Sequence, residues 1–221
     1  MCFVAGTFGV VPLCVHTIAY NLIPLLFMIP LGTGLGLAVR MGNVLATDPG
    51  RAKLLATWCV VFISLIALVV ALLLFALRNA IISLFSKDVD VIQGCLDIWM
   101  KVSFYIFVIF IFGINSAIMR ALGMQWTMAV IMFLCLWCGT LPSVVYFAMK
   151  RGGGLSAEWL ILPFGYTIMQ VILMTSYATV NWDAISHDAR QSLNRAMGDS
   201  IRHYVQQLDA SAPTEATPLL T

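Results

Sequence analysis

Long apolar blocks are the feature of this sequence that most constrains its fold. Five of them are long enough to cross a membrane as helices, because roughly 20 apolar residues span about 30 Å of hydrocarbon. They lie at about residues 13–39, 54–77, 95–119, 126–148 and 159–180. Of the 221 residues, 61% are hydrophobic and 10% are charged, whereas a soluble domain has about 25% charged residues. The sequence therefore predicts an all-α integral membrane protein and excludes a soluble enzyme, a nucleic-acid-binding protein and a disordered regulator.

The composition changes after Trp182, which divides the chain into a transmembrane bundle at 1–182 and a polar tail at 183–221. Residues 2–10 are apolar and are interpreted as a remnant of a further span or a re-entrant piece. In the tail, apolar residues recur every three or four positions and predict an amphipathic helix over about 184–208. They are Ile185, Ala189, Leu193, Met197, Ile201, Val205 and Leu208. This helix is expected either to rest on an anionic membrane surface or to pack on the protein's own loops, and residues 210–221 are expected to be disordered.

Positive charge is slightly more abundant on the side of the predicted membrane where the tail lies. Seven Lys or Arg residues fall on that side and five on the other. By the positive-inside rule this distribution favours a cytoplasmic tail. The net charge of +2 is too small to indicate an electrostatic function.

Polar side chains inside the apolar spans are the best candidates for functional residues, because hydrocarbon makes them costly. A group on the first span, spaced by about one helical turn, comprises His16, Thr17, Tyr20 and Asn21. A group on the later spans comprises Asn115, Ser116, Thr140, Tyr166 and Gln170. Together they are candidates for lining an aqueous cleft that takes a substrate, and each alone could equally form an interhelical hydrogen bond. His16 is either a proton relay near neutral pH or a side chain that reaches the membrane interface.

Other polar or small residues have structural interpretations. We expect Asp97 and Lys101 to form a surface ion pair, and Glu158 to be solvated at the boundary of a span. Gly32 and Gly36 have the small-xxx-small spacing that lets two membrane helices approach closely.

Enzymatic chemistry is not indicated. Cys135 and Cys138 have the spacing of a redox or zinc motif, but the sequence has no second such pair and no His nearby, so they are interpreted as packed thiols. No nucleotide-binding, metalloprotease or hydrolase motif is present in the sequence. We therefore predict no catalytic residue, no metal site and no cofactor.

The connections between the spans resemble those of the multidrug and toxin extrusion (MATE) family, in its eukaryotic type. Residues 38–53 look like the family's RVxNxLGAGxxxxAK segment, and residues 77–91 are similar to its FRxxIxxLFTxDxEV segment. Residues 120–125 resemble its RGxGxQ segment, and 141–142 and 181–182 match the IP and TNW positions of later spans. The residues that carry the loop signature are Arg40, Gly42, Asn43, Arg120 and Gly123.

The resemblance implies an antiporter of two six-span bundles that exports organic cations or drug-like xenobiotics in exchange for H⁺, rather than Na⁺. It implies that this chain corresponds to the second bundle, with residues 2–10 as the end of span seven and the five complete spans as spans eight to twelve. The partners implied are the lipid bilayer, a cationic substrate, and an N-terminal lobe or a full-length paralogue. The location implied is the plasma membrane or an endolysosomal or vacuolar membrane, with the C-terminus cytoplasmic.

The sequence departs from the family's pattern at positions that bear on ion coupling. The span-eight Glu of animal members aligns with Asn21 and the span-ten Asp of plant members with Ile109, and neither replacement titrates. The GLWxG opening of span twelve is altered at residues 154–158. A non-transporting, half-size membrane subunit that dimerises with or regulates a full-length transporter is therefore the alternative hypothesis.

The end of the tail contains a short sorting-like pattern. Glu215, Leu219 and Leu220 look like an acidic dileucine signal, which clathrin adaptors read to direct membrane proteins to endosomes, lysosomes or vacuoles. The other interpretation is a chance match in an unstructured tail.

Overall fold

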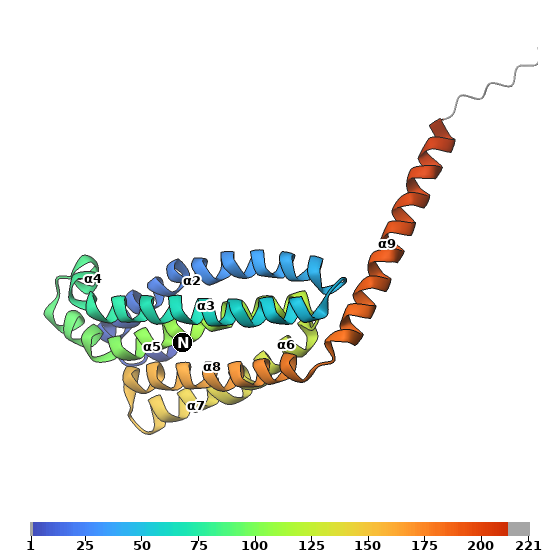
Figure 1. The fold of residues 1–221 in the computed structure, drawn as a ribbon. Helices are drawn as coiled ribbons and strands as arrows, with labels where there is room; N and C mark the ends of the chain where they lie inside the picture. The colour runs from blue at the N-terminus through green and yellow to red at the C-terminus, as the bar shows by residue number, and fades with distance from the viewer. Residues whose placement is uncertain (1, 212–221) are drawn as a thin grey trace, which may run out of the picture.

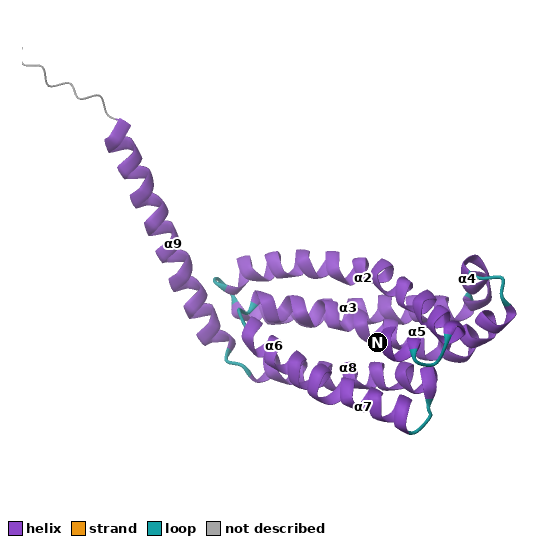
Figure 2. Ribbon diagram, turned by 180° about the vertical axis from the view of Figure 1, so that it is seen from behind, coloured by secondary structure: helices purple, strands orange, loops and turns teal. Residues whose placement is uncertain are grey.

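The computed structural model describes residues 2–211, except for the side chains of Phe3, Leu193, Ala196 and residues 204–211. Secondary structure within that range is entirely helical (Figures 1 and 2). The helices are α1 (Cys2–Gly6), α2 (Val10–Leu45), α3 (Pro49–Ala76), α4 (Arg78–Phe85), α5 (Val89–Ala121), α6 (Gln125–Met132), η1 (Phe133–Thr140), α7 (Leu141–Val145), η2 (Tyr146–Lys150), α8 (Gly154–Thr179) and α9 (Trp182–Ser211). The predicted all-α class is confirmed.

Among the residues that the structure describes, five helices are long and apolar enough to cross a membrane, which agrees with the predicted fold class. They are α2, α3, α5, the continuous helix Gln125–Lys150 formed by α6, η1, α7 and η2, and α8. The observed helices match the apolar blocks of the sequence and extend beyond each of them at one end or both. The extension of α8 matters for the site, because the helix begins at Gly154 and Glu158 therefore lies inside it.

Helix α5 forms the centre of the bundle and contacts α2, α3 and α8 (Figure 1). In its most apolar stretch 78% of the residues are buried, against 28% or less in each of the other four spans. Trp99 of α5 is 1% exposed and donates its Nε1–H to the carbonyl oxygen of Leu74 on α3 over 2.8 Å. Helices α2, α3 and α8 each place one face on α5, whereas the span Gln125–Lys150 packs mainly on α8. All four present large apolar side chains outward, as lipid requires.

Helices α2 and α5 approach each other closely at Gly34 and Gly113. A Cβ atom added at Gly34 would lie 3.1 Å from the carbonyl oxygen of Gly113, and one added at Gly113 would lie 2.7 Å from the Cβ of Pro30. The prediction that Gly32 and Gly36 form the close contact is wrong, because a Cβ at either would meet nothing within 4 Å. Those two glycines lie on the exposed face of α2.

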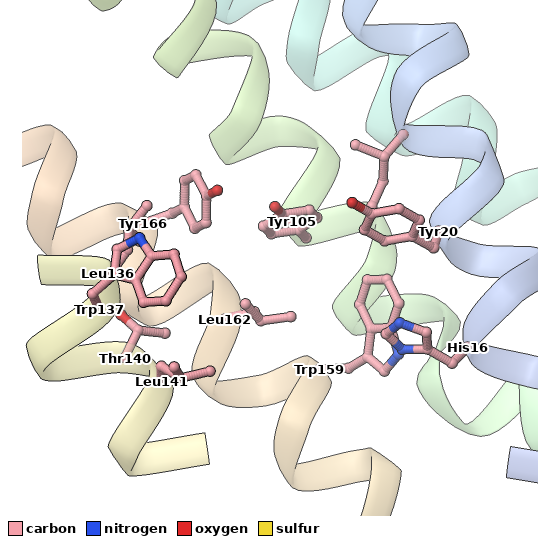
Figure 3. Close-up of a pocket in the computed structure, with 11 residues that line it drawn as sticks. His16, Tyr20, Tyr105, Leu136, Trp137, Thr140, Leu141, Trp159, Leu162 and Tyr166 are labelled. Atoms are coloured by element: carbon pink, nitrogen blue, oxygen red, sulfur yellow. The ribbon is translucent and has the colours of Figure 1, made fainter. Parts of the chain in front are cut away.

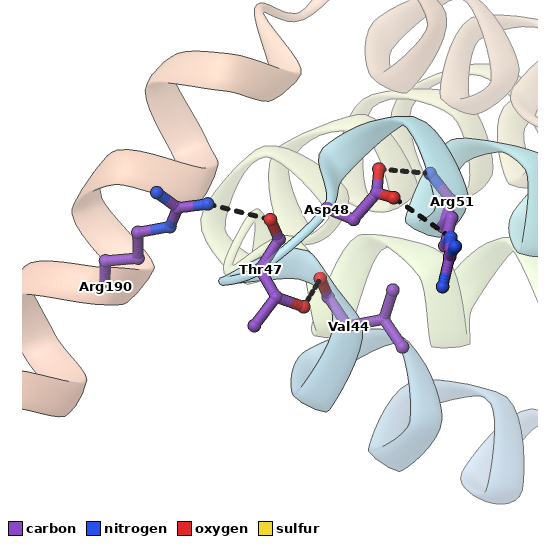
Figure 4. Close-up of polar contacts among 5 residues, drawn as sticks. All are labelled: Val44, Thr47, Asp48, Arg51 and Arg190. Carbon is purple, nitrogen blue, oxygen red and sulfur yellow. Dashed lines mark hydrogen bonds and ion pairs between the residues drawn. The ribbon is translucent and has the colours of Figure 1, made fainter.

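Helix α9 begins against the bundle and then extends away from it (Figure 1). Arg190 donates from its guanidinium to the carbonyl oxygens of Ala46 and Thr47, the latter over 2.8 Å, in the loop between α2 and α3 (Figure 4). Further along α9, Met197 and Ile201 are 54% and 61% exposed. The start of the tail helix therefore contacts the protein's own loop, whereas part of its apolar stripe is uncovered.

The loop that Arg190 contacts is itself ordered by a helix cap. Asp48 is the N-cap of α3, and its Oδ1 accepts the backbone N–H of Arg51 over 3.0 Å (Figure 4). Pro49 occupies the first turn of the helix, where its missing N–H costs nothing. Asp48 also accepts from the side chain of Arg51 over 3.1 Å.

Candidate functional site

A cavity of about 300 Å³ lies among α2, α5, η1, α7 and α8 (Figure 3). Its lining combines aromatic and aliphatic side chains with one threonine hydroxyl, three tyrosine hydroxyls and one imidazole. The lining residues are His16, Tyr20, Ile23, Tyr105, Leu136, Trp137, Thr140, Leu141, Trp159, Leu162 and Tyr166. No Lys or Arg lines this cavity, so its wall carries no permanent positive charge.

The aromatic rings of the cavity are arranged as one connected series. Tyr105 packs edge-on against Trp159, with centroids 6.0 Å apart, and edge-on against Tyr166 at 5.4 Å. His16 stacks with Tyr20 at 5.8 Å and lies 5.5 Å from Trp159. Rings from three helices therefore share one wall, and the negative faces of such rings attract cations.

The π-helical segment η1 supplies the opposite wall. Pro142 follows it and has no N–H to donate, which favours an irregular hydrogen-bond pattern in this part of the span. Thr140 donates its hydroxyl to the carbonyl oxygen of Cys135 over 2.8 Å. A Cβ added at Gly165 of α8 would lie 2.8 Å from the Thr140 methyl, so α8 approaches η1 closely here.

Of the polar residues on α2, the structure brings two to the cavity and leaves two outside it. His16 and Tyr20 line the cavity. Thr17 is exposed on the bundle surface and donates its hydroxyl to the carbonyl oxygen of Leu13 over 2.8 Å, and Asn21 is also exposed. The four residues therefore do not share one wall of the site.

On the later spans, Tyr166 and Thr140 line the cavity, whereas Asn115 and Gln170 form a separate buried contact. Asn115 Nδ2 donates to Gln170 Oε1 over 2.6 Å, and the hydroxyl of Tyr177 donates to Asn115 Oδ1 over 3.0 Å. These are the interhelical hydrogen bonds that the sequence offered as the alternative to a cleft.

The signature residues and Ser116 lie toward the end of the bundle near α9. Ser116 donates to the carbonyl oxygen of Gly113 over 2.9 Å and accepts from Arg120 Nη1 over 3.4 Å. Gly123 has a positive φ of 73°, which explains a glycine in the turn after α5. The others, which are exposed near the end of α2, are Arg40, Gly42 and Asn43.

Glu158 is buried, which corrects the expectation that it is solvated. Its side chain is 0% exposed, as is that of His16, and Glu158 Oε1 lies 3.6 Å from His16 Nδ1. The expectation was wrong because the helix begins four residues before Glu158, at Gly154, and not after it. One feature of the sequence could have indicated this burial: Glu158 precedes Trp159 at the start of a long apolar run.

Asp97 and Lys101 do not form the expected ion pair. Lys101 donates to the carbonyl oxygen and the hydroxyl of Ser156 on α8, and Asp97 accepts from Gln93 Nε2 over 3.3 Å. The spacing of Asp97 and Lys101 describes only the helix that carries both residues, whereas the partner that Lys101 binds, Ser156, lies on α8.

The cysteines and the sorting-like pattern are the other features that the sequence singled out. All the cysteines are free, and among the described residues no three His, Cys, Asp or Glu side chains gather as a metal site would require. The sorting candidates Glu215, Leu219 and Leu220 lie outside the described residues.

The chain is similar in sequence to transporters of one family. Residues 1–145 match the family model MatE. The chain is 30% identical over 124 residues to multidrug and toxin extrusion protein 1 of Danio rerio, which covers 56% of this chain and 21% of that protein. It is 26% identical over 206 residues to multidrug and toxin extrusion protein 2 of Homo sapiens, which covers 90% of this chain and 34% of that protein.

The fold agrees with a solved structure. The eukaryotic MATE transporter AtDTX14 superposes with a TM-score of 0.77 at 20% identity, over 81% of this chain and 40% of that chain. The chain thus spans about a third of the length of the human relative. Because the family model matches well over half of its residues, this multi-pass membrane chain belongs to the MatE family.

Proposed function

We propose that this chain forms one bundle of a secondary transporter that moves organic cations across a membrane in exchange for protons. The aromatic cavity carries the proposal, because its rings come from several helices of a membrane bundle and its wall has no fixed positive charge. An organic cation gains about 0.5–2 kcal/mol from each well-placed ring. The relatives named multidrug and toxin extrusion proteins support the same class of function.

The proposed roles follow from the positions of the side chains. Tyr105, Trp159 and Trp137 would contact the cation through their ring faces. His16, which lines the cavity, can bind a proton but offers no oxygen ligand for Na⁺, so that protons are favoured over Na⁺ as the coupling ion. Membership of a family of transporters supports transport over enzymatic chemistry.

Cation binding is tested with tetraphenylphosphonium and a matched pair of tryptophan variants. Trp137 lines the cavity and Trp58 lies on α3 away from it, and both are 65% exposed. Trp137→Leu should weaken binding by about fivefold, as the loss of one cation–π contact implies. Trp58→Leu should leave the dissociation constant unchanged; equal weakening in both variants would show that the cation binds elsewhere.

Transport is tested by uptake of radiolabelled tetraethylammonium into proteoliposomes with an acidic lumen. The expected result is accumulation that stops when a protonophore removes the pH gradient. Accumulation that persists without the gradient would contradict proton exchange.

A second candidate function is a subunit that acts by pairing with another bundle. Thr17 and Asn21 are polar, exposed and located inside the first span, where contact with lipid is costly. A protein partner or a water-filled cleft shared with a partner would relieve that cost. Co-expression with a full-length relative should then yield a stable complex in mild detergent, and a monomer in its presence would argue against pairing.

A further inference from the structure

The contact between His16 and Glu158 joins two titratable groups that come from different helices and are both closed off from solvent. Glu158 lies near the start of α8 and His16 near the start of α2, and both side chains are 0% exposed. The nearest atoms, His16 Nδ1 and Glu158 Oε1, are 3.6 Å apart. Both residues lie within about 10 Å of the first residue of their helix, because each helical residue adds about 1.5 Å along the axis.

None of the four polar atoms of the pair has a hydrogen-bond partner among the described residues. A buried carboxylate without hydrogen bonds is stable only if a proton or an opposite charge compensates it. The imidazole is the group placed to do this, either by taking the proton itself or by leaving it on the carboxyl group. One proton shared by the two groups leaves the pair with no net charge in either arrangement.

The other titratable or charged groups near the pair belong to three helices. Tyr20 from α2 and Tyr105 from α5 flank the rings of His16 and Trp159, and Tyr166 follows on α8. Lys101 of α5 is held by Ser156, two residues before Glu158. None of these groups is a carboxylic acid, so Glu158 provides the proton-binding carboxyl group on this side of the cavity.

The pair is connected to the cavity through the imidazole. His16 lines the cavity wall together with Trp159, whereas Glu158 lies behind that wall and next to Trp159 in the sequence. A cation that enters beside His16 therefore meets the pair at close range in surroundings of low dielectric constant. With a proton on the pair, cavity and pair would carry one uncompensated positive charge; without it, the carboxylate balances the cation.

We propose that His16 and Glu158 form a proton-exchange site in which the entry of an organic cation into the cavity displaces one proton from the pair. The bond that breaks is the O–H of the Glu158 carboxyl group or an N–H of the His16 imidazolium, and the proton passes to water. The net charge of cavity plus pair stays at zero throughout the exchange. This inference rests on the proposed function, because it names the groups that would couple protons to the cation.

Proton binding by the pair is tested first, without any cation. Infrared difference spectra of the whole chain in detergent, taken between about pH 5 and about pH 8, should show a protonated carboxyl band that disappears at high pH. Glu158→Gln should lose this band, whereas Asp97→Asn, the same chemical change at an exposed residue of α5, should keep it. In His16→Gln the band should persist to higher pH, by about tenfold in proton affinity, since the carboxylate loses its counter-charge.

Exchange is tested second, by adding tetraphenylphosphonium to the chain in weak buffer and measuring proton release with a pH indicator. Wild type and Asp97→Asn should release up to about one proton per bound cation. Glu158→Gln should lose this release while cation binding, followed by equilibrium dialysis, is retained. A thermal melt of each variant shows whether it is folded.

The infrared and proton-release experiments distinguish failure of the exchange site from failure of the proposed function. Cation binding without proton release in wild type, or equal release in Glu158→Gln, would overturn the exchange site and leave cation transport standing. Absence of cation binding in wild type would overturn the proposed function and the exchange with it, while the infrared band would still support proton binding by the pair. Wild-type spectra in which neither the carboxyl group of Glu158 nor the imidazole of His16 changes its protonation between the two pH values would overturn the pair as a proton site.

Discussion

At the scale of single residues, the contact between α2 and α5 depends on the absence of a side chain at Gly113. A Cβ there would lie 2.7 Å from the Cβ of Pro30 and 3.3 Å from its backbone carbon, so a neighbouring helix would have to move. Gly113→Ala should therefore destabilise the chain by about 1–3 kcal/mol, the usual cost of overpacking. Gly36→Ala, where a Cβ meets nothing within 4 Å, should be neutral or slightly stabilising. Thermal melts in one detergent compare the two, and equal melting temperatures would show that the helices shift freely.

A second residue-scale prediction concerns the buried contact of Asn115 with Gln170 and Tyr177. Replacing Asn115 with Val leaves Gln170 Oε1 and the Tyr177 hydroxyl without the partners they have now. The free energy of unfolding should fall by about 1–3 kcal/mol, because two buried polar groups would be left without hydrogen-bond partners. Thr17→Val removes only an exposed bond within its own helix and should change stability by less than about 0.5 kcal/mol. A similar melting temperature for both variants would argue against the buried contact as a stabilising one.

Spacing in the sequence identified the α2 glycines as packing candidates but not which of them packs. Gly32, Gly34 and Gly36 are all surrounded by apolar residues, so the sequence gives α2 no marked polar and apolar sides. Only the position of α5 decides that Gly34 faces inward. The sequence likewise does not show which polar residues of the spans are buried: His16 and Asn115 are, whereas Thr17 and Asn21 are not. In a membrane helix, exposure to lipid and burial in protein favour similar side chains, and composition cannot separate them.

At the scale of elements, the link between α9 and the α2–α3 loop predicts an effect of a single arginine. Arg190→Ala removes both hydrogen bonds to the carbonyl oxygens of Ala46 and Thr47. Hydrogen exchange should then become faster in residues 46–48 and in the first turns of α9, because the start of the helix loses its attachment to the loop. Arg195→Ala changes the same residue type at an exposed position of α9 and serves as the control. If both variants exchange like the wild type, the arginine does not hold the tail helix.

The positions of the membrane helices followed from the sequence, whereas their internal irregularities did not. Runs of about 20 apolar residues permit only a helix in hydrocarbon, so each predicted span is helical. The π-helical segments of the fourth span were not predicted, because they depend on Pro142 and on the close approach of Gly165 to Thr140. The burial of Glu158 was missed for a related reason, since a charged residue was taken to mark the end of a span. The burial of Glu158 depends instead on His16 of a neighbouring helix, which lies 3.6 Å from it.

At the scale of the whole molecule, the proposed proton site and the tail lie at opposite ends of the bundle. Glu158 is near the start of α8, whereas α9 follows the end of α8, one helix length away. The α8 helix has 26 residues, which corresponds to about 39 Å and is enough to cross a membrane. Protons would therefore reach the pair from the side of the membrane that does not hold the tail.

The orientation of the chain decides which compartment supplies those protons. Seven Lys or Arg residues lie toward the tail and five toward the other end, so the tail is expected in the cytoplasm. For the chain in the plasma membrane of intact cells, an epitope at the C-terminus should then react with antibody only after permeabilisation, whereas a tag inserted at Gly152–Gly153, between η2 and α8, should react without it. The opposite pattern would place the His16–Glu158 pair toward the cytoplasm. The pair would then lie close to the cytoplasmic surface and would exchange its proton with the cytoplasm when the cavity opens on that side.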